Sequence, residues 1–151
     1  MFAALCALSV VAGSCSGDDE VVCYEYQPVD NNVWDRQYKM TFRIDTIANS
    51  GAYDLQVCLR ALHNVQFQKV YVVVEQQYAN PYAASVDTVC LTLTDEMGNM
   101  EGKGLSLFNY TAQLPHKVNL RRGQSGTVTL RHAMRRMQLQ GINQVGVKLT
   151  R

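Results

Sequence analysis

The feature that most constrains the fold is an alternation of apolar and polar residues that recurs in short stretches along the chain. In residues 39–44 the apolar side chains are Met40, Phe42 and Ile44, and the residues between them are polar. Successive side chains of a strand point to opposite sides, so this pattern is typical of a strand with one buried face. Similar stretches predict strands at residues 21–27, 39–44, 54–63, 69–76, 87–94, 105–110, 115–120, 127–131 and 144–150.

The spacing of these stretches predicts an all-β domain. Turn residues separate them every eight to twelve residues or so, and no long amphipathic segment predicts a helix. We therefore expect an antiparallel β-sandwich of about eight to ten short strands, Ig-like or jelly-roll-like. Residues 70–74 should form a central strand, since they are rich in β-branched side chains. The connections are predicted as turns at 28–32, 48–53 and 121–126, a long loop at 77–84, a broad turn at 95–104, and one helical turn or an irregular crossing at 134–139.

The N-terminal residues have a different character and predict an export signal. Residues 2–12 are apolar or small, and this run of about a dozen residues is shorter than the roughly 20 that a membrane-spanning helix needs. Ala12, Gly13 and Ser14 are small and precede Cys15. We interpret residues 1–14 as a bacterial lipoprotein signal peptide that is cleaved before Cys15. The Cys15 thiol would then carry lipid chains such as palmitate, and at least two chains are needed for stable anchoring.

This interpretation divides the chain into the signal peptide, an acidic tether at residues 15–20 that starts with the lipidated cysteine, and a domain at 21–151. Met1 and Phe2 supply no basic residue ahead of the apolar run, which departs from the usual signal. The alternatives are an ordinary secretory signal with an incidental cysteine, or a buried N-terminal element. The acidic residues after Cys15 resemble the surface-export tag of Bacteroidetes lipoproteins, and the alternative is a solvated linker. The expected location is the cell envelope, anchored to the outer membrane and facing either the periplasm or the surface.

No constellation of residues predicts catalysis, a metal site or a cofactor. His63, His116 and His132 lie far apart, and no metal-ligand spacing occurs. The net charge of +1 indicates no general attraction to nucleic acid. Residues 123–126 (Gly-Gln-Ser-Gly) lack the glycine that a nucleophile elbow needs two residues after the serine, and a strand follows where the motif needs a helix. Residues 95–99 have a methionine where a calcium loop would place an oxygen ligand. We expect turns at both places and a protein that is not an enzyme.

Three cysteines remain in the predicted domain: Cys23, Cys58 and Cys90. An odd number in an exported chain argues against a full disulfide framework. A cross-strand bond between Cys58 and Cys90 is compatible with the alternation, but three unpaired cysteines that pack as small apolar residues are the preferred interpretation.

Aromatic residues near predicted loops are the candidate binding residues. Tyr78, Tyr82 and Tyr110, together with Phe108, could form a platform for sugars or a protein-binding patch. The alternative is packing at the rim of the sandwich. Thr46 and Thr88 both lie in an Asp-Thr-aliphatic tripeptide, which fits the O-glycosylation pattern of Bacteroidetes, with Thr46 in a turn and Thr88 at the start of a strand.

From Cys23 onward the chain resembles the gliding-motility-associated lipoprotein family GldH of Bacteroidetes. The residues that carry the resemblance are 24–26 with Pro28, Trp34-Asp35, 42–46, 53–55, Leu59-Arg60, 91–93, 102–104, Met134-Arg135 and above all 141–149; residues 61–68 depart from the family pattern. The resemblance implies a cell-envelope lipoprotein linked to gliding machinery in gliding relatives. It supplies no catalytic residues, and it does not imply that this organism glides.

Three functions are therefore considered. The leading hypothesis is a non-enzymatic, membrane-anchored accessory component of an envelope protein complex, with envelope proteins as partners. The second is a surface lipoprotein that binds polysaccharide through its aromatic residues. The third is a hydrolase with a site assembled from scattered residues, which would require a polar cleft with converging acids or histidines.

Overall fold

The computed structural model describes residues 19–151, and most of these residues form strands; the longest connection between strands is residues 93–106. The only helical turn among them is the 3-10 turn η1 (Asp30–Asn32). The strands are β1 (Val21–Pro28), β2 (Val33–Asp35), β3 (Met40–Ile44), β4 (Gly51–Leu62), β5 (Lys69–Ala79), β6 (Ala83–Thr92), β7 (Leu107–Gln113), β8 (Val118–Leu120), β9 (Ser125–His132), β10 (Gln138–Gln140) and β11 (Ile142–Thr150).

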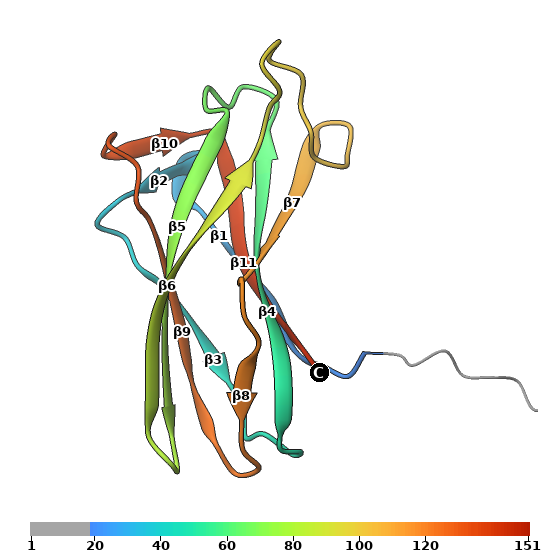
Figure 1. Ribbon diagram of the computed structural model, residues 1–151. Helices are drawn as coiled ribbons and strands as arrows, with labels where there is room; N and C mark the ends of the chain where they lie inside the picture. The colour runs from blue at the N-terminus through green and yellow to red at the C-terminus, as the bar shows by residue number, and fades with distance from the viewer. Residues whose placement is uncertain (1–18) are drawn as a thin grey trace, which may run out of the picture.

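Two antiparallel sheets form the layers of a sandwich (Figure 1). The first sheet has the order β1-β11-β4-β7, with the short β8 pairing with the start of β4. The second has the order β3-β9-β5-β6. A separate ribbon of β2 and β10 lies at one end. The prediction of an antiparallel β-sandwich is confirmed.

The pairing order is that of a jelly roll. When the short strands β2, β8 and β10 are set aside, the first strand pairs with the last (β1 with β11) and the second with the second-last (β3 with β9). In the same way β4 pairs with β7, and β5 pairs with β6 in a hairpin. The chain is thus one long hairpin that is rolled up, and the contacts of β11 with β4 and of β9 with β5 complete the sheets.

The core lies between the sheets and is built by the predicted alternation. Met40, Phe42 and Ile44 of β3 are almost fully buried, as expected from the sequence. The matching inward residues of the other long strands are Leu55, Val57, Leu59, Val70, Val72, Val74, Val128, Leu130, Val145, Val147 and Leu149. At the end closed by the β2–β10 ribbon, Trp34 is buried with the ring of His132 edge-on at 5.3 Å between ring centroids.

Three connections differ from the sequence-based expectation. Residues 77–84 are not a long loop, because β5 and β6 stay paired up to Tyr78 and Ala83 and leave a tight turn. Residues 134–139 form no helical turn; they lead into β10, which pairs with β2. The turn before β4 is shorter than expected, since Tyr53 is already a buried strand residue. In the first case the Gln-, Tyr- and Ala-rich sequence hid the strand, because the hairpin partner stabilises it more than its composition does.

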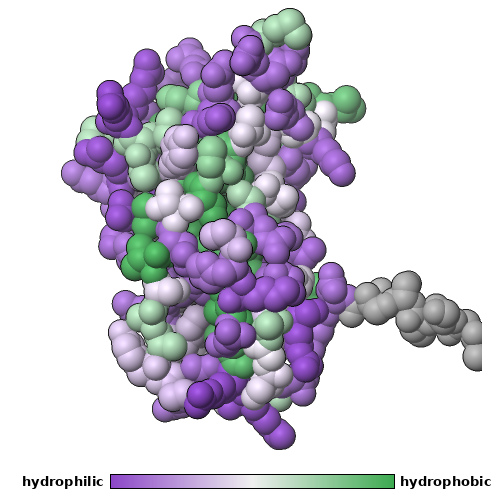
Figure 2. All heavy atoms as spheres, viewed as in Figure 1, coloured by the Kyte–Doolittle hydropathy of each residue, from purple (hydrophilic) through white to green (hydrophobic). Residues whose placement is uncertain are grey.

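The surface is mainly polar. In the view of Figure 2, hydrophilic residues cover most of the molecule, and hydrophobic residues appear in small, separated areas. Of the residues that the structure describes, none belongs to a helix that is long and apolar enough to cross a membrane.

Candidate interaction surface

The outer side of the first sheet carries aromatic and basic residues in register. Tyr24 of β1 lies opposite Lys148 of β11, which lies opposite Gln56 of β4. Two residues further along, Tyr26 lies opposite Gly146, and the next row holds Gln144 opposite Arg60. Because Val145, Val147 and the alternate residues of β4 are buried in the core, the side chains in register between them share the outer side. We call this surface the tyrosine–arginine face, made up of Tyr24, Tyr26, Gln56, Arg60, Gln144 and Lys148.

Arg60 is held in place by neutral groups. Its Nε donates to Asn109 Oδ1 at 2.9 Å, and its Nη1 donates to Gln144 Oε1 at 2.7 Å. The guanidinium carbon lies 3.9 Å from the centre of the Tyr26 ring, within the range of a cation–π contact. These contacts fix the guanidinium without neutralising it, and they leave further N–H donors of the fork for another molecule.

Tyr26 can lie on the sheet because the opposite residue is Gly146. A Cβ built on Gly146 would come within 2.7 Å of Tyr26 Cδ1 and 2.6 Å of the Glu25 carbonyl oxygen. The Cys58 thiol lies in the same row and is fully buried. Burial raises the pKa of the Cys58 thiol and also the pKa of the Tyr26 phenol. Both groups are therefore neutral and part of the packing, and the charges of this surface come from Arg60 and Lys148.

The two cations of the tyrosine–arginine face have no carboxylate partner. Lys148 Nζ lies 5.4 Å from the centre of the Tyr24 ring. Among residues 19–151, neither Arg60 nor Lys148 has an acidic oxygen within 4.0 Å. Tyr24 is 56% exposed, so its ring is open to a partner. A partly buried cation without a counter-ion loses hydration without gaining an ion pair, so such a surface favours an anionic partner.

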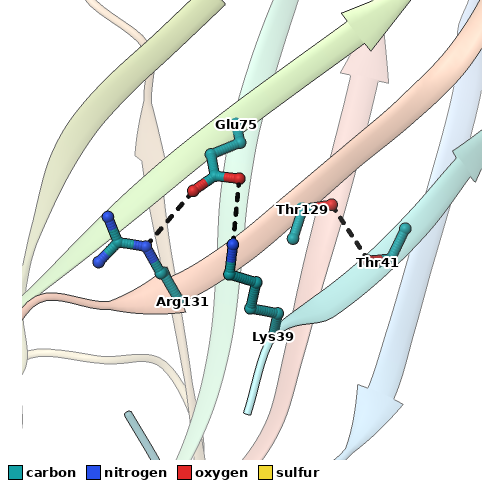
Figure 3. A network of polar contacts seen from close by, with 5 residues as sticks. All are labelled: Lys39, Thr41, Glu75, Thr129 and Arg131. Carbon is teal, nitrogen blue, oxygen red and sulfur yellow. Dashed lines mark hydrogen bonds and ion pairs between the residues drawn. The ribbon is translucent and has the colours of Figure 1, made fainter. Parts of the chain in front are cut away.

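The outer side of the second sheet is organised in another way, around a carboxylate (Figure 3). Glu75 of β5 accepts from Arg131 Nε at 3.4 Å and lies 3.5 Å from Lys39 Nζ. Beside this group the hydroxyls of Thr41 and Thr129 are 3.1 Å apart. We call this surface the glutamate face, made up of these five residues. Its cations are already paired within the protein.

The structure separates the aromatic residues that the sequence suggested as a binding platform. Tyr78 and Tyr110 are only 4% and 6% exposed, and each donates its hydroxyl to an internal acceptor, Gln76 Oε1 and the Leu93 carbonyl oxygen. Burial raises the pKa of Tyr78 to about 12. The platform prediction is wrong for these two residues, because their rings serve the core. Tyr82 is 77% exposed and is the member that a ligand can reach.

The exposed tyrosines of β1 were missed by sequence reasoning, although the signal was present. Tyr24 and Tyr26 alternate with Cys23 and Glu25 in a predicted strand, so both tyrosines had to share one side of it. What the sequence could not supply was the register that sets Arg60 and Lys148 beside them, because β4 and β11 are distant in the chain.

The other predicted positions are placed as follows. Thr46, in the connection after β3, and Thr88, within β6, are both exposed. The turn predicted at 123–126 is shorter than expected, because Ser125 and Gly126 already belong to β9; ahead of them Gln124 Oε1 accepts from the Arg121 N–H. The turn at 95–99 is closed by Asp95 Oδ1, which accepts from the N–H groups of Met97 and Asn99. Cys15, the predicted lipidation site, lies outside the described residues.

The histidines and cysteines are dispersed. His132 is buried, and its Nδ1 accepts from the Met134 N–H at 3.4 Å; burial lowers the pKa of its imidazole. Within the described residues, no three His, Cys, Asp or Glu side chains gather as a metal site. Cys58 lies in the first sheet and Cys90 on the exposed side of the second. All three cysteines are free; Cys58 packs as a small buried residue and Cys23 is half-buried, whereas Cys90 is exposed and does not fit the expected apolar packing.

Comparison with known proteins identifies a family. The model of the GldH lipoprotein family matches residues 21–149, which is nearly the whole chain. No curated protein matches the chain. Among solved structures, the chain is similar to the Eiger TNF of S. frugiperda at 9% sequence identity and a TM-score of 0.40, over 70% of this chain and 62% of that one. The chain thus spans less than two thirds of that structure.

Proposed function

This chain belongs to the GldH lipoprotein family, and from that membership we propose that it is a lipid-anchored, non-enzymatic accessory component of a protein complex in the bacterial cell envelope. A lipoprotein family implies membrane association through a lipid anchor and a place in the cell envelope. In gliding relatives the complex would be the gliding machinery. The observation that carries the proposal is the family match over residues 21–149.

The proposed anchor is Cys15. The family match and β1 both begin at Val21, so residues 15–20 are left as a tether between lipid and domain. Residues 1–14 would be removed as the signal peptide, and the mature protein would be held at the outer membrane, with the acidic tether favouring the cell surface. A di- or triacylated cysteine provides the two or more chains that stable anchoring requires.

Replacement of Cys15 by Ala tests the anchor. Fractionation of cells should show the wild-type protein with the membranes and the variant in the aqueous fraction, because the variant has no thiol to acylate. Serine at the same position serves as a second, nearly isosteric variant. A variant that stays with the membranes and resists aqueous extraction would exclude this anchor.

The proposed docking surface for an envelope protein is the tyrosine–arginine face. Arg60 and Lys148 lack carboxylate partners in the described part of the chain, and Tyr24 is open beside them. Tyrosine and arginine are also the residue types that most often dominate protein interfaces. The partner surface that fits this face carries Asp or Glu.

Photo-crosslinking in intact cells tests the docking surface. A photoreactive amino acid at position 24 should give protein adducts, whereas the same group at position 86, where Val86 is 69% exposed on the other sheet, should not. Lys148→Glu should reduce the adducts from position 24, and Arg43→Glu, on the second sheet, should leave them unchanged. Adducts with polysaccharide alone, or equal adducts from both positions, would contradict the proposal.

A second candidate function is binding of a surface polysaccharide, and Tyr82 is the observation that favours it. Its exposed ring borders a surface pocket of about 380 Å³ that is also lined by Arg43 and Gln77. Aromatic rings beside polar donors suit the alternating apolar and hydroxyl faces of a sugar. Tyr82→Ala should then lower the affinity for the polysaccharide. Tyr71→Ala, at another exposed tyrosine, is the matched control.

O-glycosylation at Thr46 and Thr88 stays a proposal. Mass spectrometry of the protein purified from its native host should show glycan on peptides that contain these residues, and Thr46→Ala or Thr88→Ala should remove it from the corresponding peptide. Unmodified peptides at both positions would exclude the modification.

A further inference from the structure

The point at which the predicted tether joins the domain is fixed by the last residue of the chain. Arg151 donates its N–H to the Glu20 carbonyl oxygen at 2.9 Å, and its guanidinium lies 3.8 Å from the Glu20 carboxylate. Arg151 Nη2 also donates to the Ser50 carbonyl oxygen at 3.3 Å. The tether therefore leaves the domain beside the turn that precedes β4.

That turn belongs to an end of the sandwich in which three turns are bonded together. We call it the turn end, made up of residues 45–50, 80–82 and 121–124. The Arg122 N–H donates to Ser50 Oγ at 2.8 Å, and the Ile47 N–H donates to the Gln124 carbonyl oxygen at 2.7 Å. Gln124, only 2% exposed, donates its Nε2 to the Pro81 carbonyl oxygen at 2.7 Å. A continuous series of contacts thus connects Glu20 with the β5–β6 turn.

The turn end has unneutralised positive charge. Within the turn end the one acidic residue, Asp45, is paired with Arg43 at 3.4 Å, and Asp54 of β4 is paired with Lys117 at 2.8 Å. In residues 19–151, Arg121 and Arg122 have no acidic group within 4.0 Å, and both are exposed. Tyr82, Leu120 and Arg121 are among the residues that line a pocket of about 410 Å³. The combination of free arginines and one protruding tyrosine suits a layer of lipid headgroups, where aromatic rings lie at the level of the headgroups and cations lie near the phosphates.

The length of the tether decides which end can reach the membrane. Five residue steps separate Cys15 from Glu20, so a fully extended tether spans at most about 18 Å. The pairing of Thr150 with Asp54 sets Arg151 level with Tyr53, nine residue steps from the end of β4 at Leu62. The far end of β4 therefore lies about 30 Å away. An orientation with the opposite end of the sandwich on the membrane and the turn end pointing away is therefore excluded, because the tether is too short to reach the lipid. Figure 1 shows the start of the described chain and the C-terminus in the half of the molecule that ends in these turns.

We propose that the turn end rests on the membrane surface, with Arg121 and Arg122 against lipid phosphates and Tyr82 at the level of the headgroups. This inference rests on the proposed anchor at Cys15. It leaves the tyrosine–arginine face directed sideways, accessible to a protein in the envelope.

Tryptophan fluorescence tests this orientation. Trp34 is the single tryptophan of the chain and is fully buried, so it gives a constant background. Tyr82→Trp, Tyr24→Trp and Tyr71→Trp place exposed probes at the turn end, on the tyrosine–arginine face and near the far end. The lipidated full-length proteins are reconstituted in phosphatidylethanolamine–phosphatidylglycerol vesicles whose acyl chains carry bromine, which quenches tryptophan at short range.

The expected result is a loss of fluorescence for Tyr82→Trp, a smaller loss for Tyr24→Trp and none for Tyr71→Trp. In the Tyr82→Trp background, Arg121→Glu with Arg122→Glu should reduce the quenching, and added salt should have the same effect in the parent. If the vesicles float in a density gradient and the protein does not float with them, both the proposed anchor and this inference are wrong. Flotation of the protein with stronger quenching at position 24 or 71 than at 82, or with none at all, overturns the orientation alone.

Discussion

The two outer faces of the sandwich treat their cations differently. On the glutamate face, one carboxylate pairs with both Arg131 and Lys39. On the tyrosine–arginine face, Arg60 is held by two amide oxygens and a tyrosine ring, and Lys148 lies over another ring. Both faces are built on the same kind of antiparallel sheet and both fix their long side chains. They differ in whether the charge is cancelled inside the protein.

This difference supports the proposal that the tyrosine–arginine face, and not the glutamate face, binds a partner protein. A cation paired with Glu75 gains little from meeting a second carboxylate, because its charge is already compensated. A cation that is fixed by neutral groups keeps its charge and has already lost much of its side-chain freedom. The arrangement on the tyrosine–arginine face therefore favours association over self-contained stability.

The largest effect is expected at Gly146, where the Tyr26 ring lies against β11. Gly146→Val would place side-chain atoms against the Glu25 carbonyl oxygen and the Tyr26 ring, which would displace β1 from β11. We expect the free energy of unfolding to fall by about 2–3 kcal/mol, as for other overpacked sites. Denaturant titration measures this loss.

Gly51→Ala is the matched control for Gly146, since its Cβ would meet only the Arg151 side chain, which can move. A loss of stability at Gly51 as large as that at Gly146 would contradict the account of Tyr26 lying on Gly146.

A change in pH is expected to alter stability through His132, which is buried in the core and belongs to neither outer face. Burial lowers the pKa of His132 in the folded protein below its usual 6.5. The unfolded chain then binds more protons between the two pKa values, so stability is full above about pH 6.5 and falls as the pH drops below it. Denaturant titration at about pH 7.5 and about pH 5.5 should show a loss at acid pH that is smaller in His132→Gln. An identical pH dependence in both proteins would exclude His132 as a source.

The smallest expected effect concerns the charges of the two faces themselves. Glu75→Gln removes the common partner of two cations at a partly exposed site, and should lower the free energy of unfolding by about 0.5 kcal/mol, less at high salt. Lys148→Gln should change stability less, since Lys148 has no ion pair within residues 19–151. Denaturant titration at low and high salt measures both. A larger loss of unfolding free energy for Lys148→Gln than for Glu75→Gln would contradict the conclusion that only the glutamate face pairs its cations within the protein.

The β-sandwich could be predicted from the sequence because the alternation within each longer strand identifies which of its residues point into the core. The alternation of Met40, Phe42 and Ile44 defines a buried side without knowledge of the rest of the chain. Short strands such as β10 could not be predicted, because three residues are too few to show an alternation. The extension of β5 to Ala79 could not be predicted either, because it depends on the hairpin partner β6. The jelly-roll order of the strands could not be predicted, because the alternation does not indicate which strands pair with each other.

The candidate surface was accessible only in part. Nearness to predicted loops suggests Tyr78 and Tyr110 as platform residues, but the hydroxyls of both donate to acceptors inside the protein. Tyr26 and Arg60, by contrast, are brought together by long-range pairing of β1, β11 and β4. Short-range patterns identify which side of a strand is exposed, and they cannot show which neighbours share it.

The pairing of the first strand with the last has a consequence for how such a chain could mature. β11 lies between β1 and β4, so it supplies the neighbour of β1 and fills the interior of the first sheet. A chain that enters a translocation channel with its N-terminus first cannot close this sheet until its final residues have emerged. The leading segment would remain unfolded and accessible to processing enzymes throughout that passage. Contacts this distant in sequence also make folding slow, which would extend the interval in which an N-terminal modification can be completed.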